Sequence, residues 1–242
     1  MADPHMSAAS PTAAPPMDTS PWLASFPADL RSRFLSSIRV RDLDDGRSIF
    51  RTGDPPDGLY GVVRGQVRLV MRFPGGQQLL NHVAEAGDWF GEISTLDGRP
   101  RLNDAICTGP TRIAHLPQAD AERVMRDDPT FVRAMARLAS RRHRAAMAFA
   151  GRTLTQPLSA QIAYALLSLT RKQGRAEHDL ALRHEDVASI VGTSRQTVAV
   201  HLRRLGDRGL VALGYRSIRI LDLAALKAEA HAAPDGHGMP SR

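Results

Sequence analysis

Cysteine is almost absent, because Cys107 is the single cysteine in 242 residues. One cysteine cannot form a disulfide within the chain or supply an all-cysteine metal or iron–sulfur site. A reducing compartment suits such a sequence. No apolar run approaches the ~20 residues that a membrane-spanning helix needs. We therefore expect a cytoplasmic protein that has no membrane partner.

Motifs of catalysis are missing as well. A jelly-roll metal enzyme would need a His-x-His pair, a following Glu and a later His, whereas His82 and His115 stand alone. Neither a nucleophile elbow nor a phosphate-loop lysine is found. We expect no catalytic residue and no metal site, and a metal enzyme is the remote alternative. A heme iron could use His82, His115 or His143, although a lone histidine is more often structural or exposed.

The net charge of +7 is concentrated in one part of the chain. Residues 129–227 hold 17 Lys and Arg against 6 Asp and Glu, whereas the rest holds 15 against 19. Neutralising phosphates releases counterions and supplies most of the non-specific affinity for nucleic acid. The pattern favours double-stranded DNA as a partner, and the alternative is an arginine-rich solvated surface.

Glycines at short intervals punctuate residues 44–116, which predicts frequent turns. Between them lie short β-rich segments at residues 59–63, 66–71, 78–83 and 111–116. Short strands at this spacing are typical of an antiparallel barrel or jelly roll.

A long helix is predicted after Pro129, where glycine almost disappears. Apolar residues recur there at steps of 4, 3, 4, 3 and 4, interrupted once by an arginine: Phe131, Met135, Leu138, Arg142, Ala145 and Phe149. Such a seam is typical of a coiled coil. We expect a homodimer joined through residues 129–151, and packing of the helix on its own barrel is the alternative.

Two short helices follow near the C-terminus, separated by Gly192, Thr193 and Ser194. The second helix would turn Val198, Leu202 and Leu205 inward and leave short polar residues and an arginine outward at its start. A recognition helix needs this arrangement to reach base edges in the major groove. Strands at residues 209–211 and 217–221 predict a wing with its tip at Tyr215 and Arg216. The expected DNA-binding residues are Thr193, Ser194, Arg195, Gln196, Thr197, His201, Arg203 and Arg216.

These residues carry a resemblance. The segment from Gly192 to Val211 resembles the G-x-S-R-x-T-V-x-x-x-L-x-x-L-x-x-x-G-L-I pattern of the cyclic-AMP receptor protein / fumarate-nitrate regulator (Crp/Fnr) family. Phe90-Gly91-Glu92 and Pro100-Arg101 resemble the sensor motifs of the same family. The resemblance implies an α+β fold, with an N-terminal double-stranded β-helix (jelly-roll) barrel of the cyclic-nucleotide-binding type, a long dimerisation helix and a C-terminal winged helix-turn-helix.

Composition and the breaks in the sequence pattern, together with this resemblance, set the domain boundaries. We expect a disordered N-terminus at residues 1–21, of which 1–6 resemble a vector-derived remnant, and a disordered tail at 229–242. The sensor domain would span 22–128, the dimerisation helix and hinge 129–155, and the winged helix-turn-helix 156–228.

The resemblance also implies a ligand, a cyclic nucleotide such as cGMP or cAMP. Amides after Gly91 and the guanidinium of Arg101 would hold its phosphate, and Glu92 would accept the ribose 2′-hydroxyl. The implied ligand-binding residues are Phe90, Gly91, Glu92, Ile93, Ser94, Arg101, Leu102, Asn103, Ala146 and Met147.

The family pattern is not complete at this site. Leu102 replaces a phosphate-binding hydroxyl, Asp104 adds a nearby acid, and Ala146 and Met147 stand where an adenine-contacting Thr-Ser pair would be. Three alternatives follow: a cyclic nucleotide other than cAMP, an unrelated small ligand, or a degenerate pocket in an effector-independent regulator.

The expected function is that of a transcription regulator, not an enzyme. A dimer would place two recognition helices one DNA turn apart, with a hinge near residues 151–157. Arg195 would read a guanine, and Gln196 would set the preference at a neighbouring base pair. RNA polymerase would be a further partner if the regulator activates.

Overall fold

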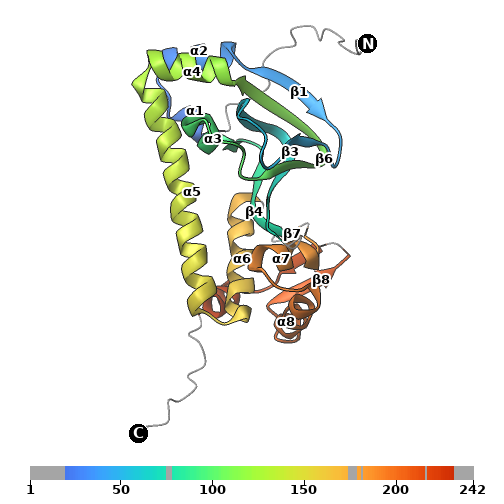
Figure 1. Ribbon diagram of the computed structural model, residues 1–242. Coiled ribbons are helices and arrows are strands. Elements are labelled where there is room, and N and C mark those ends of the chain that lie inside the picture. Colours follow the sequence, from blue (N-terminus) through green and yellow to red (C-terminus); the bar gives the residue numbers. More distant parts are fainter. Residues whose placement is uncertain (1–19, 75–77, 174–178, 181, 216, 232–242) are drawn as a thin grey trace, which may run out of the picture.

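The computed structural model describes residues 20–74, 78–173, 179–180, 182–215 and 217–231. An N-terminal β domain, a long helix and a smaller C-terminal domain follow one another (Figure 1). Most of the two segments predicted to be disordered lies outside the described residues. Ser20 and Pro21, however, begin the first helix, and the last helix includes Glu229. The ordered part of the chain therefore extends a few residues beyond the predicted limits at each end.

The β domain consists of one antiparallel sheet with short helices around it. The strands run in the order β1-β6-β3-β4, with β2 on β6 and β5 on β3. Its elements are α1 Pro21–Ala24, α2 Ala28–Ser36, β1 Arg39–Leu43, β2 Ser48–Phe50, β3 Gly58–Arg72, β4 Gln78–Glu85, β5 Trp89–Phe90, α3 Glu92–Asp97, β6 Asp104–Pro117 and α4 Gln118–Asp127. The antiparallel architecture predicted from the glycine spacing is confirmed.

Two of the predicted strands are one. Residues 59–63 and 66–71 both belong to β3, which pairs with β6 along its length and shifts register on either side of Arg64. Gly65, which separates the two predicted strands in the sequence, therefore lies at an irregularity within one continuous strand. Gly65 has φ +87°, and a Cβ there would lie 2.7 Å from the carbonyl oxygen of Pro110. Only glycine fits this close approach of two backbones.

An aromatic cluster fixes the start of the long helix α5, Pro129–Thr155. The rings of Trp22, Phe26, Phe34 and Phe131 pack edge-to-face or tilted with centroids 4.7–6.2 Å apart. The indole of Trp22 also donates to the carbonyl of Ala134 at 3.0 Å. The N-terminal helices, which the sequence patterns did not predict, therefore hold α5 on the β domain.

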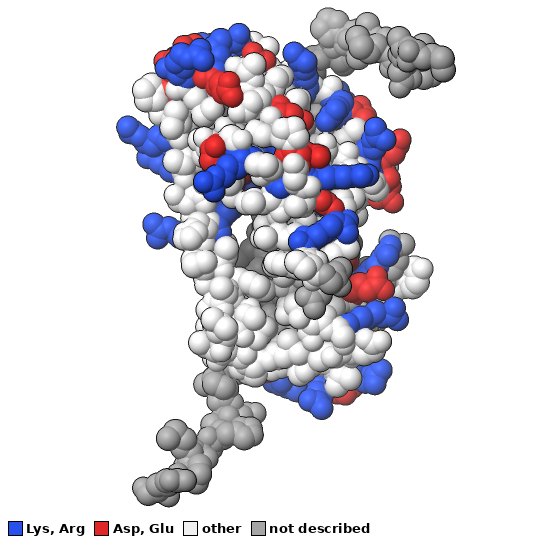
Figure 2. Space-filling model, viewed as in Figure 1, with Lys and Arg blue, Asp and Glu red and all other residues white. Residues whose placement is uncertain are grey.

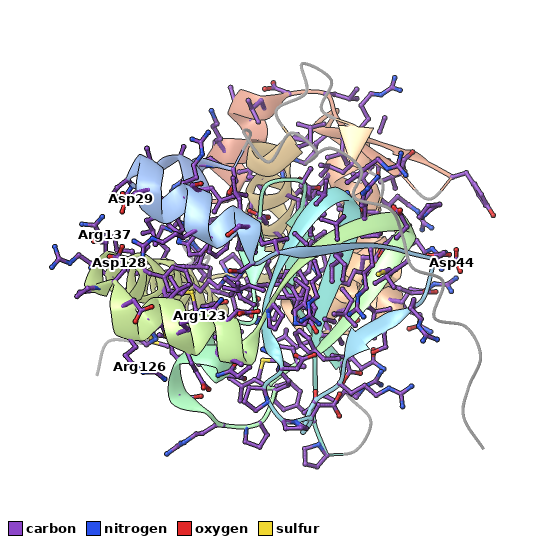
Figure 3. All side chains as sticks on the ribbon, turned by 90° about the horizontal axis from the view of Figure 1, so that it is seen from above. Asp29, Asp44, Arg123, Arg126, Asp128 and Arg137 are labelled. Carbon is purple, nitrogen blue, oxygen red and sulfur yellow. The ribbon has the colours of Figure 1, made fainter. Side chains whose placement is uncertain are left out.

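Ion pairs also link α2 to the start of α5. Asp128 caps α5 by accepting from the amide of Thr130, and the guanidinium of Arg33 bridges Asp128 and Asp29 at 2.8 and 3.2 Å. Figure 3 shows Asp29 and Asp128 at the edge where α2 meets α5. The hydrogen bond from the Thr130 amide, with a smaller contribution from the Arg33 guanidinium, holds the pKa of Asp128 below its usual value, and desolvation opposes this shift only weakly.

The helix predicted from Pro129 is confirmed, but its predicted dimer seam is wrong in its first half. Phe131, Met135 and Leu138 are buried in the chain's own core together with the N-terminal aromatic residues. Arg142 also faces the β domain, where it forms an ion pair with Glu92. The alternative of packing on its own barrel holds for these four positions.

The C-terminal domain forms a second core. Its elements are α6 Leu158–Gln173, β7 Asp179–Leu180, α7 His184–Val191, α8 Arg195–Asp207, β8 Val211–Gly214, β9 Ser217–Ile220 and α9 Leu223–Glu229. Val198, Leu202 and Leu205 of α8 are at most 1% exposed, as the helix pattern predicts. The predicted wing corresponds to β8 and β9, and Tyr215 between them is 93% exposed.

The two domains touch through β4 and α7. The hydroxyl of Ser189 accepts from the amide of Leu80 and donates to the carbonyl of Gln78, both at 3.1 Å. Arg68 of β3 forms an ion pair with Asp186 of α7 at 2.6 Å. Helix α7 therefore covers the outer edge of the sheet. None of the helices in the described part of the chain is long and apolar enough to cross a membrane.

Candidate effector cavity and DNA interface

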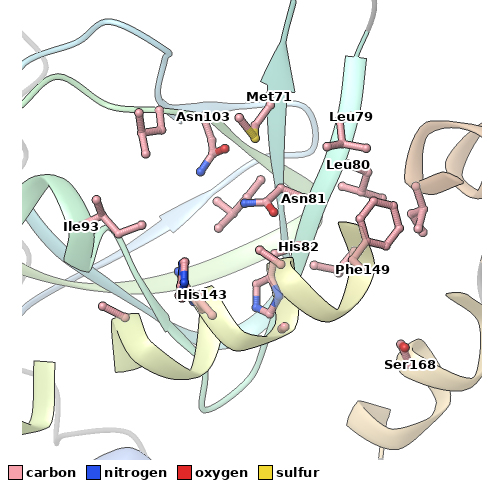
Figure 4. Close-up of a pocket in the computed structure, with 18 of the residues that line it drawn as sticks. Met71, Leu79, Leu80, Asn81, His82, Ile93, Asn103, His143, Phe149 and Ser168 are labelled. Carbon is pink, nitrogen blue, oxygen red and sulfur yellow. The ribbon is translucent and has the colours of Figure 1, made fainter. Parts of the chain in front are cut away.

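A cavity of about 630 Å³ lies between the β domain, α5 and α6. Figure 4 shows Met71, Leu79 and Asn81 of the β3–β4 hairpin on one side and Phe149 of α5 on another. Nine of the ten predicted ligand-binding residues line it, and Phe90 alone does not. Phe90 is fully buried and stacks on Tyr60 at 5.7 Å, so it is a core residue.

The turn before α3 requires glycine. Gly91 has φ +90°, and a Cβ there would lie 2.8 Å from Nη1 of Arg101 and 3.2 Å from the carbonyl oxygen of Gly58. This close packing places Glu92 at the first position of α3, against the cavity. The Phe-Gly-Glu motif thus sets the backbone of the cavity wall.

Glu92 is an ion-pair partner of the long helix. Its carboxylate is 1% exposed and receives Nη1 of Arg142 at 2.8 and 3.1 Å. The other terminal nitrogen of Arg142 donates to the carbonyl of Trp89 at 2.6 Å. A buried carboxylate needs such a partner, and the pair explains why an arginine interrupts the apolar pattern of α5.

Arg101 is 2% exposed and is held by several acceptors. Its Nη2 lies 2.6 Å from both the Asp57 carboxylate and the Gly58 carbonyl, and its Nη1 donates to the Gly91 carbonyl at 2.9 Å. The guanidinium also lies 4.4 Å from the ring centre of Phe50. Its Nε is buried and has no hydrogen-bond partner among the described residues.

The residues after Arg101 differ in orientation. Leu102 is half exposed at the cavity, and Asn103 lines it, while its buried Oδ1 has no hydrogen-bond partner among the described residues. Asp104, the acid that departs from the family pattern, does not line the cavity and instead accepts from the Thr52 amide and from Arg72. Burial raises the pKa of Asp104, but these contacts outweigh it and the net pKa is lowered.

Two of the three histidines considered for a heme line the cavity. His82 and His143 face it from β4 and α5 (Figure 4), and Nε2 of His82 lies 3.6 Å from Asp88. His115 instead stacks on Tyr60 at 4.4 Å, and burial lowers its pKa. No group of three or more metal-ligating side chains occurs among residues that the structure describes.

Several cavity residues belong to the C-terminal domain and were not predicted. They are Tyr164, Ala165, Ser168 and Leu169 of α6 and Ile190 of α7. No local motif marks them, because only the docking of the two domains brings them to the cavity.

The predicted DNA interface is formed by the turn from α7 to α8. Gly192 ends α7 with φ +70°, and the Ser194 hydroxyl caps α8 by accepting from the Thr197 amide at 3.1 Å. Arg195 and Gln196 are exposed in the first turn of α8, where the helix dipole favours phosphate. On the face in Figure 2, Lys and Arg side chains line the lower edge, over this domain.

The other predicted DNA-binding residues lie in this turn, along α8 or outside the described residues. Thr193 and His201 are half-buried, and burial, with Arg204 nearby, lowers the pKa of His201. Arg203 is exposed. Arg195 forms an exposed ion pair with Glu185 at 3.2 Å, which a phosphate or base could replace. Arg216 lies outside the described residues.

An antiparallel β domain, a cavity against a long helix and a C-terminal helix-turn-helix with an exposed, arginine-bearing second helix are the features of a DNA-binding regulator. Two family models match in the same order: the cyclic nucleotide-binding domain over residues 40–128 and the Crp-like helix-turn-helix domain over residues 160–229. The chain is 33% identical over 193 residues to the cyclic AMP receptor protein of Thermus thermophilus, a match that covers 80% of this chain and 88% of that one.

Other relatives belong to the same class of regulator. A CRP-like cAMP-activated global transcriptional regulator of Mycobacterium tuberculosis is 29% identical over 188 residues, 75% of this chain and 83% of its own. The crystal structure of a CRP/FNR-family transcriptional regulator from Thermus thermophilus superposes with a TM-score of 0.69 at 28% identity, over 81% of this chain and all of that one. The chain belongs to the Crp/Fnr family of DNA-binding transcription regulators and is not an enzyme.

Proposed function

We propose that this regulator acts as a homodimer on double-stranded DNA and that a small molecule in the cavity sets its DNA affinity. The observation that carries the proposal is the position of the cavity. Its wall includes α3 of the sensor, α5 and α6 of the DNA-binding domain, so a molecule that fills it would contact all three. A cyclic nucleotide, cGMP or cAMP, is the candidate ligand. A DNA target also favours the cytoplasm, and RNA polymerase would be a partner of an activator.

A different face of α5 supports the dimer. Residues at steps of 4, 3, 4, 3 and 4 are all exposed: Ala136, Ser140, His143, Met147, Ala150 and Leu154. Met147 is 55% and Leu154 is 85% exposed, which is unusual for apolar side chains on a stable helix. Small and larger residues both occur in this row, at coiled-coil spacing. Two copies of this face would bury both sets of apolar side chains and bring a second helix to the cavity.

The dimer is tested by sedimentation of Leu154→Asp. A charge at the seam should convert the dimer to a monomer at micromolar concentration. Ala148→Asp is the matched control, because Ala148 is exposed on the same helix but lies off the seam. Equal sedimentation of the two variants would place the interface elsewhere.

Ligand control is tested by isothermal titration with cAMP and with cGMP, followed by DNA binding at fixed salt. We expect saturable binding that tightens DNA affinity and is lost in Arg101→Ala. Tight specific DNA binding without any nucleotide binding would favour the effector-independent alternative. The two terminal nitrogens of Arg101, which already bind Gly91, Asp57 and Gly58, and the apolar Leu102 support that alternative.

Base reading is tested with Arg195→Ala. The loss of a bidentate guanine contact costs about 1 to 3 kcal/mol and relaxes preference at one base pair. An equal loss on random DNA would show that Arg195 contacts only the phosphate backbone.

A further inference from the structure

Helix α8 turns one apolar side chain toward the solvent. Val198, Leu202 and Leu205 of this helix are at most 1% exposed and belong to the core of the C-terminal domain. Val200, by contrast, is 46% exposed. Among the residues of α8, all of which the structure describes, it is the one large apolar side chain outside the core. It is not among the DNA-binding residues predicted from the sequence.

Val200 lies in the middle of the exposed face of α8, at the lower edge of the C-terminal domain (Figure 1). Gln196 precedes it by four residues and Arg203 follows it by three, and residues at these spacings share one face of a helix. Both of these polar residues are exposed. His201, the next residue, is half-buried and has the charge of Glu229 of α9 near it. Val200 is therefore better placed than His201 to meet a partner on the exposed face.

Valine is an unusual residue for the middle of this face. Its branched side chain forms helices less well than alanine, and in water it gains nothing from burial. The exposed neighbours Arg195, Gln196 and Arg203 carry hydrogen-bonding groups that suit phosphates and base edges. Val200 carries only methyl groups. The apolar group that a base presents in the major groove is the C5-methyl of thymine.

We propose that Val200 determines sequence specificity by packing against the C5-methyl group of a thymine in the DNA site. The inference rests on the proposed reading of bases from the start of α8 and adds an apolar contact to it. Val200 follows Arg195 by five residues, a rise of about 7.5 Å along the helix. This rise corresponds to roughly two base pairs at about 3.4 Å each. The thymine is therefore expected about two base pairs from the base that Arg195 contacts.

Deoxyuridine provides the test, because it differs from thymidine only by this methyl group. The full wild-type chain first selects a preferred site from random duplexes, and deoxyuridine then replaces each thymine of that site in turn. We expect one position for each bound chain at which the replacement weakens binding by about three- to five-fold, the factor for one buried methyl group. At that position Val200→Ala, which lacks both γ-methyl groups, should bind the two duplexes equally, whereas Val200→Ile should keep the discrimination.

The matched control is Val132→Ala, the same substitution at a valine of α5 that is 37% exposed. It should leave the discrimination between thymine and deoxyuridine unchanged. Unfolding in urea should show no loss of stability in Val200→Ala, because the side chain is exposed and alanine is the better helix former.

Three results overturn the inference. They are a selected site that contains no thymine, wild-type binding that is insensitive to deoxyuridine at every thymine, and discrimination that persists in Val200→Ala. The outcome is distinct from that of Arg195→Ala, because the loss in that variant is measured at a different base pair. A chain that selects no sequence at all would contradict both the methyl contact and the proposed reading of bases.

Discussion

The contact between the two domains gives a quantitative prediction. Arg68 and Asp186 form a partly buried ion pair, with side chains 31% and 11% exposed. Exposed pairs contribute about 0 to 1 kcal/mol, whereas breaking a fully buried pair costs about 3 to 5 kcal/mol. Asp186 also accepts from the Arg183 amide at 2.8 Å, which leaves it partly satisfied after Arg68 is removed. Arg68→Met should therefore weaken docking by about 1 to 2 kcal/mol, a factor of roughly 5 to 30.

Hydrogen exchange of one amide reports this change. The Leu80 amide lies on the outer edge of the sheet and donates to Ser189 of the other domain, so it loses its partner when the domains separate. Its exchange rate should rise in Arg68→Met by the same factor as the undocked population. Arg64→Met on the same strand is the control, because Arg64 is exposed. Unchanged exchange of Leu80 in Arg68→Met would refute the role of the ion pair in docking.

Three further changes test the interior. Arg142→Met should lower the free energy of unfolding in urea by about 3 to 5 kcal/mol, because Glu92 keeps a buried charge without its partner; a loss near zero would contradict this. The pKa of Asp104 is lower in the folded chain than the ordinary value of ~3.9, so its carboxylate stabilises the fold above that pH and the gain is lost as pH falls through the folded pKa. Asp104→Asn should therefore lose less stability than the wild type between neutral and acid pH in urea titrations, and parallel curves would exclude this role. Gly98→Ala, in open space at φ +70°, should cost about 1 to 2 kcal/mol, whereas Gly58→Ala should cost clearly more in thermal unfolding because its Cβ would lie 2.0 Å from a carbonyl oxygen.

The C-terminal domain was predictable because its signals are local. Gly192 ends one helix, Ser194 caps the next, and Val198 and Leu202 recur at helical spacing. Each of these features acts within a few residues, and the structure confirms the two helices and the wing that they predict. The glycine-punctuated β domain was predictable in class for the same reason.

The packing of α5 could not be read from its own periodicity. Phe131 and Leu138 repeat like a coiled-coil seam, yet the N-terminal helices cover them. A periodic apolar stripe shows that a helix buries one face and does not show which partner covers it. Leu154, 85% exposed on another face, is recognised as a seam residue only after the first face is assigned.

The same limit applies to the cavity. Glu92 and Arg101 were found from their motifs, whereas Arg142 and Ser168 come from distant parts of the chain and carry no motif. Arg142 was noticed as an anomaly in an apolar seam, and a charged residue at such a position indicates a specific buried partner. That partner is Glu92, 50 residues earlier in the chain.

Helix α5 is the element through which the cavity and the DNA interface can influence each other. Arg142 ties its middle to the α3 wall of the cavity, while Arg152 near its end donates to Gln156 and to the carbonyl of Ala230 in the DNA-binding domain. A ligand that alters the contact of Glu92 with Arg142 therefore acts on a helix whose far end is bonded to the other domain. Since a ligand shifts an equilibrium only by its differential affinity for two states, we expect two such states to differ at the Glu92–Arg142 pair and at the Ser189 contact with β4.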